Sequence, residues 1–264
     1  MTPQSPILVL DRADCELDLV LAGRILTRVE LDVLNTSLRT RVAIADTPAR
    51  LADLVPLART ISDDLAALAI QQAQGCRQDT PCRDACPGCC KDPVPLSVPE
   101  AFALAQEIDS MPPRTRARLF KAAAAAEGCA QPAAICPMLL EGPAGSPRCG
   151  IYPRRPSTCR QYVAAAPGKA RRTHPHAARS VQSGIPSVRE ALALLAAQLE
   201  HTQAETVALP LAPTWVLRHL DRAQRTWGAL QLVEEFSRVL RELCGGGAAK
   251  ARTDATASGT RTAA

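Results

Sequence analysis

Aromatic residues are scarce in this chain of 264 residues, since phenylalanine, tryptophan and tyrosine together make up 3% of it. Hydrophobic residues nevertheless reach 47%, so the core has to be built mostly from leucine, alanine and valine, and such cores are usually helical. Lysine is also scarce, with only four among the 31 basic residues. Nucleic-acid binders gather basic and aromatic side chains on one face, a pattern that is not evident here. We attribute the arginine excess to codon bias in a GC-rich bacterial genome and expect no nucleic-acid partner.

Signals for export or membrane insertion are also missing. Residues 1–20 include four acidic side chains and lack a basic start followed by an unbroken apolar segment, which argues against a secretory leader. No run approaches about 18 apolar residues, so no membrane span is expected. We therefore expect a reducing cytoplasmic location without a membrane partner, where clustered cysteines more often bind metal than form disulfides.

Cysteine, by contrast, is abundant, with eleven residues in all. Seven of them fall into three groups: a C-x3-C-x2-C-C group, a single cysteine before Pro-Met-Leu, and a final pair ten residues apart. A cysteine that acts as a small hydrophobe follows the apolar period of its helix or strand, and these do not. The candidate metal ligands are therefore Cys82, Cys86, Cys89, Cys90, Cys136, Cys149 and Cys159.

Free thiols and disulfides are the alternatives to metal ligation. Disulfide frameworks are typical of short secreted chains, whereas this chain is long, its cysteine count is odd, and a bridge between Cys89 and Cys90 would be strained. A Cys-x2-Cys hook lets two thiolates reach one ion from a tight turn, and Gly88 supplies the backbone freedom that such a turn often needs. The spacing favours metal ligation.

The metal itself is left open between zinc and iron. A structural zinc ion takes four ligands and an iron–sulfur cluster takes four cysteines, so seven candidates exceed either requirement. Two centres, or one centre with spare redox thiols, both agree with this number. Cys89 and Cys90 point in different directions on most backbones, so they could bind different metals or one larger cluster.

Arginine and tyrosine accompany the last two cysteines. The four arginines are Arg148, Arg154, Arg155 and Arg160. Guanidinium groups would offset the negative charge of a thiolate-bound metal and donate hydrogen bonds to sulfur; the alternative is that Arg155-Pro156 only shapes a turn. Tyr152 and Tyr162, the two tyrosines of the chain, are candidates for packing or hydrogen bonding around the metal, or for an ordinary aromatic patch in the core.

Local patterns predict the elements around these groups. Apolar residues at odd positions from 17 to 33 predict strands with a hairpin turn at 22–24, with a helix as the alternative. Thr47 is a candidate N-cap for a helix with Pro48 in first position, which Pro56 would kink or divide and Gly75 would end. Residues 130–162 are rich in proline and glycine, so the cysteines there are expected on irregular chain that metal binding would help to fold.

Caps and breakers predict the later helices. Ser97 and Glu100 form a capping box before a helix over 98–110, and a helix over 114–127 follows a Met-Pro-Pro break. Ser187 caps a helix reaching about 206, and a last helical region covers 214–244.

These elements predict a mainly α fold with a small N-terminal β-hairpin, in which a loop-rich cysteine-cluster metal domain packs on helices. The predicted divisions are an N-terminal β-rich segment (1–46), a helix-flanked cysteine-cluster domain (47–165), a basic linker (166–186), C-terminal helices (187–244) and a disordered tail (245–264). The sequence assigns no role to Cys76, Cys129, His174 and His176, and we expect Cys15 and Cys244 to take no part in metal binding.

The cysteine segments carry a resemblance to a known family. It rests on Cys86-Pro-Gly-Cys89-Cys90, Ser97-x-x-Glu100, Cys136-Pro-Met-Leu, Cys149-Gly-Ile-Tyr152 and Arg155-Pro-x-x-Cys159-Arg160-x-Tyr162. Together they resemble the YkgJ-type cysteine-cluster family, the CxxCxxCC zinc- or iron-chelating domain, over about residues 76–165. One departure is that three residues, rather than two, separate Cys82 from Cys86. The resemblance implies metal binding by zinc or iron.

Two functions follow from this resemblance. The first is a metal-binding protein that coordinates zinc or an iron–sulfur cluster in a structural, storage or transfer role. The second is iron–sulfur-dependent protein methyl transfer, because the flagellin lysine N-methylase is similar in its cysteine pattern. The sequence shows neither a glycine-rich loop after a strand, which would bind a nucleotide-type cofactor, nor an acid–base pair for catalysis. We therefore favour the first function and name no catalytic residue, substrate or protein partner.

Overall fold

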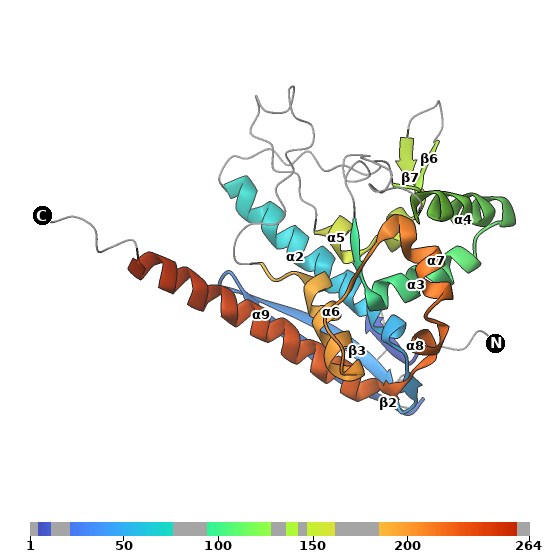
Figure 1. The fold of residues 1–264 in the computed structure, drawn as a ribbon. Coiled ribbons are helices and arrows are strands. Elements are labelled where there is room, and N and C mark those ends of the chain that lie inside the picture. The colour runs from blue at the N-terminus through green and yellow to red at the C-terminus, as the bar shows by residue number, and fades with distance from the viewer. Residues whose placement is uncertain are drawn as a thin grey trace, which may run out of the picture.

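The computed structural model of the chain describes residues 5–11, 22–75, 94–127, 136–141, 147–161 and 185–257. Helices dominate it, and a small antiparallel sheet stands near the N-terminus (Figure 1). This confirms the predicted mainly α fold. None of the helices in these ranges combines the length and the apolar character that a membrane crossing requires.

The N-terminal sheet consists of β1 (Ile7–Leu10), β2 (Arg24–Val33) and β3 (Thr36–Ala45) in the order β1-β3-β2. Val29, Leu31 and Val33 are buried while their neighbours in β2 are exposed, as the predicted period of two requires. This face of the sheet packs against α2 (Val55–Gly75) and α9 (Ala229–Ala257). Ile25 is the exception to the pattern, with 46% of its surface exposed.

A hairpin turn that the sequence did not predict lies between β2 and β3. Leu34 and Asn35 connect β2 to β3 with φ angles of 51° and 62°, the left-handed geometry that suits two-residue hairpin loops. Ala22 and Gly23 do form a turn into β2, but the chain before them lies outside the described residues. Leucine rarely adopts this conformation, so residue preferences did not indicate the turn at Leu34.

The first helical run begins later than predicted. Pro48–Ala49 forms β4, which pairs with β9 (Trp227–Gly228), so Thr47 does not cap a helix. A 3-10 turn, η1 (Leu51–Leu54), comes next, and its cap is the Arg50 N–H donating to Asp53 Oδ2 at 2.7 Å. Pro56 is the second residue of α2, so the change from 3-10 helix to α-helix falls just before it, and α2 ends at the predicted Gly75.

The two central helices agree with their predicted caps. α3 (Val98–Asp109) starts with the Ser97–Glu100 capping box, and α4 (Pro113–Glu127) follows the proline break. Before α3, the short strand β5 (Pro95–Ser97) pairs with β8 (Thr206–Ala208).

The C-terminal elements are more divided than predicted. α6 (Val188–Glu200) has Ser187 as its cap and stops at His201, which has a φ of 54°, because residues from Thr206 onward join β8. The predicted helical region 214–244 splits into α7 (Ala212–Leu217), α8 (Leu220–Gln224) and α9, and the 3-10 turn η5 (Leu209–Leu211) precedes them. α9 continues to Ala257, over most of the segment for which the sequence predicts disorder, and the alanines after Gly247 favour helix.

One cluster of buried side chains runs from Ile7 in β1 to Leu240 in α9. Met138, Ile151 and Cys159, from the region of the later cysteines, belong to the same cluster. That region therefore packs on the main core.

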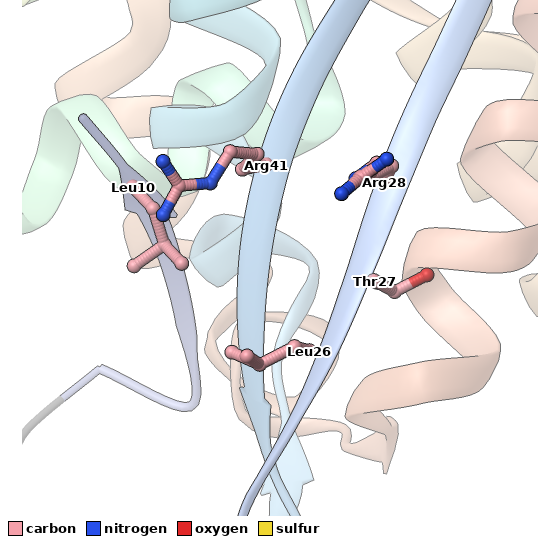
Figure 2. Close-up of a pocket in the computed structure, with 5 residues that line it drawn as sticks. All are labelled: Leu10, Leu26, Thr27, Arg28 and Arg41. Atoms are coloured by element: carbon pink, nitrogen blue, oxygen red, sulfur yellow. The ribbon is translucent and has the colours of Figure 1, made fainter. Parts of the chain in front are cut away.

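The outer face of the sheet has a hollow of about 380 Å³ (Figure 2). Its lining residues are Leu10, Leu26, Thr27, Arg28 and Arg41. Arg28 and Arg41 are cross-strand partners, and Arg41 donates to the Asp11 carbonyl at 3.3 Å. α2 covers the opposite face of the sheet and also packs against the helix that carries Cys159, so the hollow is separate from the cysteine region.

Candidate metal centre

Three of the seven candidate ligands lie in the described residues: Cys136, Cys149 and Cys159. The first group of cysteines lies outside them, as do Tyr162 and the unassigned Cys76, Cys129, His174 and His176. The predictions for those residues stay predictions.

A short hairpin joins the segments of Cys136 and Cys149. β6 (Leu139–Glu141) pairs with β7 (Pro147–Cys149), which sets Leu139 opposite Cys149. The Leu139 N–H donates to the Cys136 carbonyl at 3.0 Å, and the Gly150 N–H donates to the Met138 carbonyl at 2.8 Å. Met138 is buried and anchors the hairpin in the core. The second and third cysteine groups are therefore neighbours in the fold.

Cys159 lies on α5 (Ser157–Arg160), a four-residue helix between α2 and α6. The preceding turn, η4 (Tyr152–Arg154), leads to Pro156, whose restricted φ suits the start of a helix. Cys159 itself is buried, with 9% of its surface exposed. Its environment is thus part of the core, unlike the half-buried settings of Cys136 and Cys149.

Hydrogen bonds fix α5 to the start of α3 and to the start of α6. Glu100 Oε2 accepts from the N–H and the hydroxyl of Ser97 at 2.9 and 2.8 Å, and its Oε1 accepts from the Ser157 N–H at 2.6 Å. Gln161, just after α5, donates to the Pro186 carbonyl and accepts from the Val188 N–H. The buried carboxyl group of Glu100 therefore joins the start of α3 to the helix that carries Cys159.

Another hydrogen bond joins α5 to β5. Thr158 Oγ1 donates to the Pro95 carbonyl at 3.0 Å, and Pro95 follows Cys90 by five residues. Five residues of chain span at most about 18 Å. This contact anchors the segment that follows the first cysteine group beside Cys159.

The arginines near Cys159 bond mainly to backbone. Arg155 lies over the Tyr152 ring, 3.7 Å from its centroid, and donates to the Tyr152 carbonyl at 3.0 Å. Arg160 donates to the carbonyls of Pro153 and Arg155 and to the Asp63 carboxylate on α2. Burial lowers the pKa of Arg160 while Asp63 raises it, and a guanidinium stays charged in any case. These contacts agree with the turn-shaping alternative, and a role in offsetting metal charge stays a prediction.

Within the described residues, no group of three or more His, Cys, Asp or Glu side chains is arranged to hold a metal ion. A four-ligand centre would therefore have to draw on residues outside those ranges as well. The donor chemistry does fit zinc or an iron–sulfur centre, because thiolates are the soft ligands that both prefer.

Cys244 differs from the three candidate ligands in position and in chemistry. It lies on α9 and is half-buried. Burial raises the pKa of its thiol, and the neighbouring Asp32 raises it further. A protonated thiol is a poor metal ligand, and the exclusion of Cys244 from the site stays a prediction.

Two residues that sequence reasoning missed now join the site. Glu100 was predicted as a helix cap and as part of the motif that resembles the cysteine-cluster family, but not as a contact of the cysteine region, and Ser157 was not singled out. Their hydrogen bond spans 57 positions, so the capping box was the only local signal for either residue.

Comparison with known proteins places a domain over these cysteines. Residues 81–180 match the model of the CxxCxxCC family, described as "Putative zinc- or iron-chelating domain". The match includes all three cysteine groups and confirms the resemblance of the sequence motifs to this domain over residues 81–180. No curated protein and no solved structure matches the chain, and the resemblance to the flagellin methylase is therefore not shown.

Proposed function

From the zinc- or iron-chelating domain at residues 81–180, we propose that this protein binds zinc or an iron–sulfur cluster through cysteine thiolates. The ligand set is drawn from Cys82, Cys86, Cys89, Cys90, Cys136, Cys149 and Cys159. The observation that carries the proposal is the coincidence of this domain with cysteine segments that strand pairing and hydrogen bonds join to the rest of the fold.

Two of those anchors support a single region of binding. The β6–β7 pairing sets Leu139, three residues after Cys136, opposite Cys149, and the Thr158–Pro95 hydrogen bond ties Cys159 to the chain that follows Cys90. A metal bound by several of these thiolates would cross-link segments that are distant in sequence, and its binding free energy would add to folding stability.

No observation favours methyl transfer as a second function. The sheets in the described part of the chain are antiparallel. The doubly wound fold that commonly binds nucleotide cofactors has a parallel sheet instead. The proposal is therefore limited to metal binding.

The first test is the metal and acid-labile sulfide content of the full chain, purified without oxygen, together with its absorption spectrum. Iron with sulfide and a brown colour would identify an iron–sulfur cluster. Stoichiometric zinc in a colourless sample would identify a zinc site, which is redox-silent. A protein without either metal would contradict the proposal.

Cysteine substitutions locate the site. Cys89→Ser and Cys149→Ser are expected to lower the bound metal and to increase protease cleavage within residues 76–165. Cys244→Ser is the matched control, because this half-buried thiol lies outside the domain, and its metal content is expected to equal that of the wild type. Unchanged metal in both of the first two variants would remove these ligands from the assignment.

A further inference from the structure

The outward side of α4 carries three positive charges in a row. Arg114, Arg118 and Lys121 are exposed, and their spacing of four and three residues sets them on one side of the helix. The buried residues of α4 have the same spacing five positions later, about 140° around the helix axis. They are Leu119, Ala123 and Ala126. The three cations, which we call the cationic row, therefore lie on the side of α4 away from the core.

No acidic side chain of the described residues neutralises the cationic row. The ion pairs in that part of the chain join other residues. The acidic residue of α4 itself, Glu127, accepts from the Arg218 guanidinium at 2.8 Å. α9 shows the contrasting arrangement, because its Arg238 donates to Glu235 and Glu242 on the same helix. On α4 the sequence places cations alone.

The cationic row does not stabilise α4. Like charges four residues apart on a helix repel each other, which applies to Arg114 and Arg118. Arg114 also lies in the first turn of α4, where the helix dipole disfavours a positive charge. A bound anionic group would relieve both effects, so the arrangement favours an anionic partner.

The rest of this face indicates the class of partner. The exposed positions near the cations hold small side chains: Ala117, Ala124 and Ala125. Phe120, the aromatic residue of α4, is half-buried and packs against the core. Proteins usually bind single-stranded nucleic acid with aromatic side chains on which bases stack, and helices at a membrane surface insert bulky apolar side chains. This face offers neither, whereas the carboxylates of another protein need only the cations.

We propose that the cationic row of α4 is a docking surface for an acidic segment of another protein, held by ion pairs to its carboxylates. α4 lies within residues 81–180, which match the chelating domain. The partner would therefore dock on that domain. The inference goes beyond metal binding and does not depend on it.

The test measures binding of the full chain to a labelled alanine-rich peptide with glutamate at every fourth position, by fluorescence anisotropy at about 0.1 M salt. Charges more than about 10 Å apart are largely screened there, so the signal reports close ion pairs. The triple variant Arg114→Gln, Arg118→Gln and Lys121→Gln is expected to bind about tenfold more weakly, because each exposed ion pair contributes a modest free energy. The same peptide with glutamine in place of glutamate is expected not to bind.

A second triple variant is the matched control for total charge. Arg28→Gln, Arg189→Gln and Arg241→Gln remove the same charge from β2, α6 and α9, at positions that have no carboxylate partner among the described residues either. This variant is expected to keep the wild-type affinity. Equal weakening in the two triple variants would overturn the proposal, because net charge alone would then explain the binding.

The melting temperature distinguishes docking from a structural role. Glutamine is a good helix former, so the α4 variant is expected to melt at or above the wild-type temperature, with unchanged metal content. A lower melting temperature would overturn the proposal, since the cations would then serve the fold. Failure of the wild type to bind the glutamate peptide would overturn it as well. Tighter binding of a single-stranded oligonucleotide or of phosphatidylglycerol vesicles, lost in the α4 variant, would reject a protein partner.

Discussion

The carboxyl group of Glu100 links two helix starts through three hydrogen bonds, and its side chain is almost fully buried. Glu100→Ala would leave these donors without their acceptor in the core. Each buried donor that loses its partner costs about 1–3 kcal/mol, so we expect the free energy of unfolding to fall by about 3 kcal/mol or more. Denaturant unfolding, followed with metal content, measures the effect.

α6 provides a matched control for this variant. Glu190 occupies the same position after Ser187 as Glu100 does after Ser97, but Glu190 is exposed. Glu190→Ala is expected to change the unfolding free energy by less than about 0.5 kcal/mol, as is usual for surface positions. Equal losses in the two variants would show that capping alone accounts for the effect of Glu100.

Asp64 on α2 gives the fold a pH dependence. Burial raises the pKa of Asp64, the adjacent Asp63 raises it further, and a hydrogen bond from Thr40 opposes both. Because the pKa is higher in the folded state, this group favours folding below the unfolded pKa near 3.8, and that contribution is lost as the pH rises through the folded value. Asp64→Asn is therefore expected to stabilise the protein at pH 7.

The same variant is expected to have little effect at about pH 3, where the carboxyl group is protonated in both states. Thermal unfolding at the two pH values measures the difference. An equal shift at both values would assign the effect to packing and not to ionisation.

For single residues, sequence reasoning was strongest where chemistry is local. The spacing of the cysteines identified the segment that the CxxCxxCC family model matches, and Ser97-x-x-Glu100 identified a cap that the structure confirms. The bond from Glu100 to Ser157 could not be predicted, because the residues are 57 positions apart and no local pattern pairs them.

Among the strands and helices, the β2–β3 hairpin depends on two residues with left-handed backbone, Leu34 and Asn35. A β-branched residue is disfavoured in this conformation, and the strain amounts to about 1–2 kcal/mol. Asn35→Val is therefore expected to lower the free energy of unfolding by that amount, measured by urea titration. Ser37→Val, at an exposed position in β3, is expected to be neutral because valine favours strands. Equal unfolding free energies for Asn35→Val and Ser37→Val would contradict the assignment of the hairpin turn to Leu34 and Asn35.

The predicted elements were most accurate where a cap or a proline marks an end. The starts of α3 and α6 are examples, since Ser97 and Ser187 precede both. The errors came from pairings of two or three residues between distant segments, β4 with β9 and β5 with β8. Such pairings depend on tertiary contacts, which local sequence patterns do not show. The expected helix start at Thr47 is therefore strand β4, and the residues expected at the end of α6 belong to β8.

The chain as a whole shares one core between its N-terminal sheet, its C-terminal helices and the cysteine region. Phe236 of α9 is among its largest fully buried side chains. Phe236→Ala is expected to lower the free energy of unfolding by about 3–5 kcal/mol. Because Cys159 packs in the same cluster, we expect metal release and loss of helix to shift together to lower denaturant concentration.

Leu217→Ala is the control for this variant, since 56% of the Leu217 surface is exposed. Its unfolding free energy is expected to stay within about 0.5 kcal/mol of the wild-type value. Helix signal and bound metal are followed in the same titration. Metal release that keeps its wild-type midpoint in Phe236→Ala, while the helix signal moves, would show that the cysteine domain folds apart from the C-terminal helices. If the midpoints of metal release and of the helix signal shift together, the metal site depends for its stability on the core formed by β1–β3, α2 and α9.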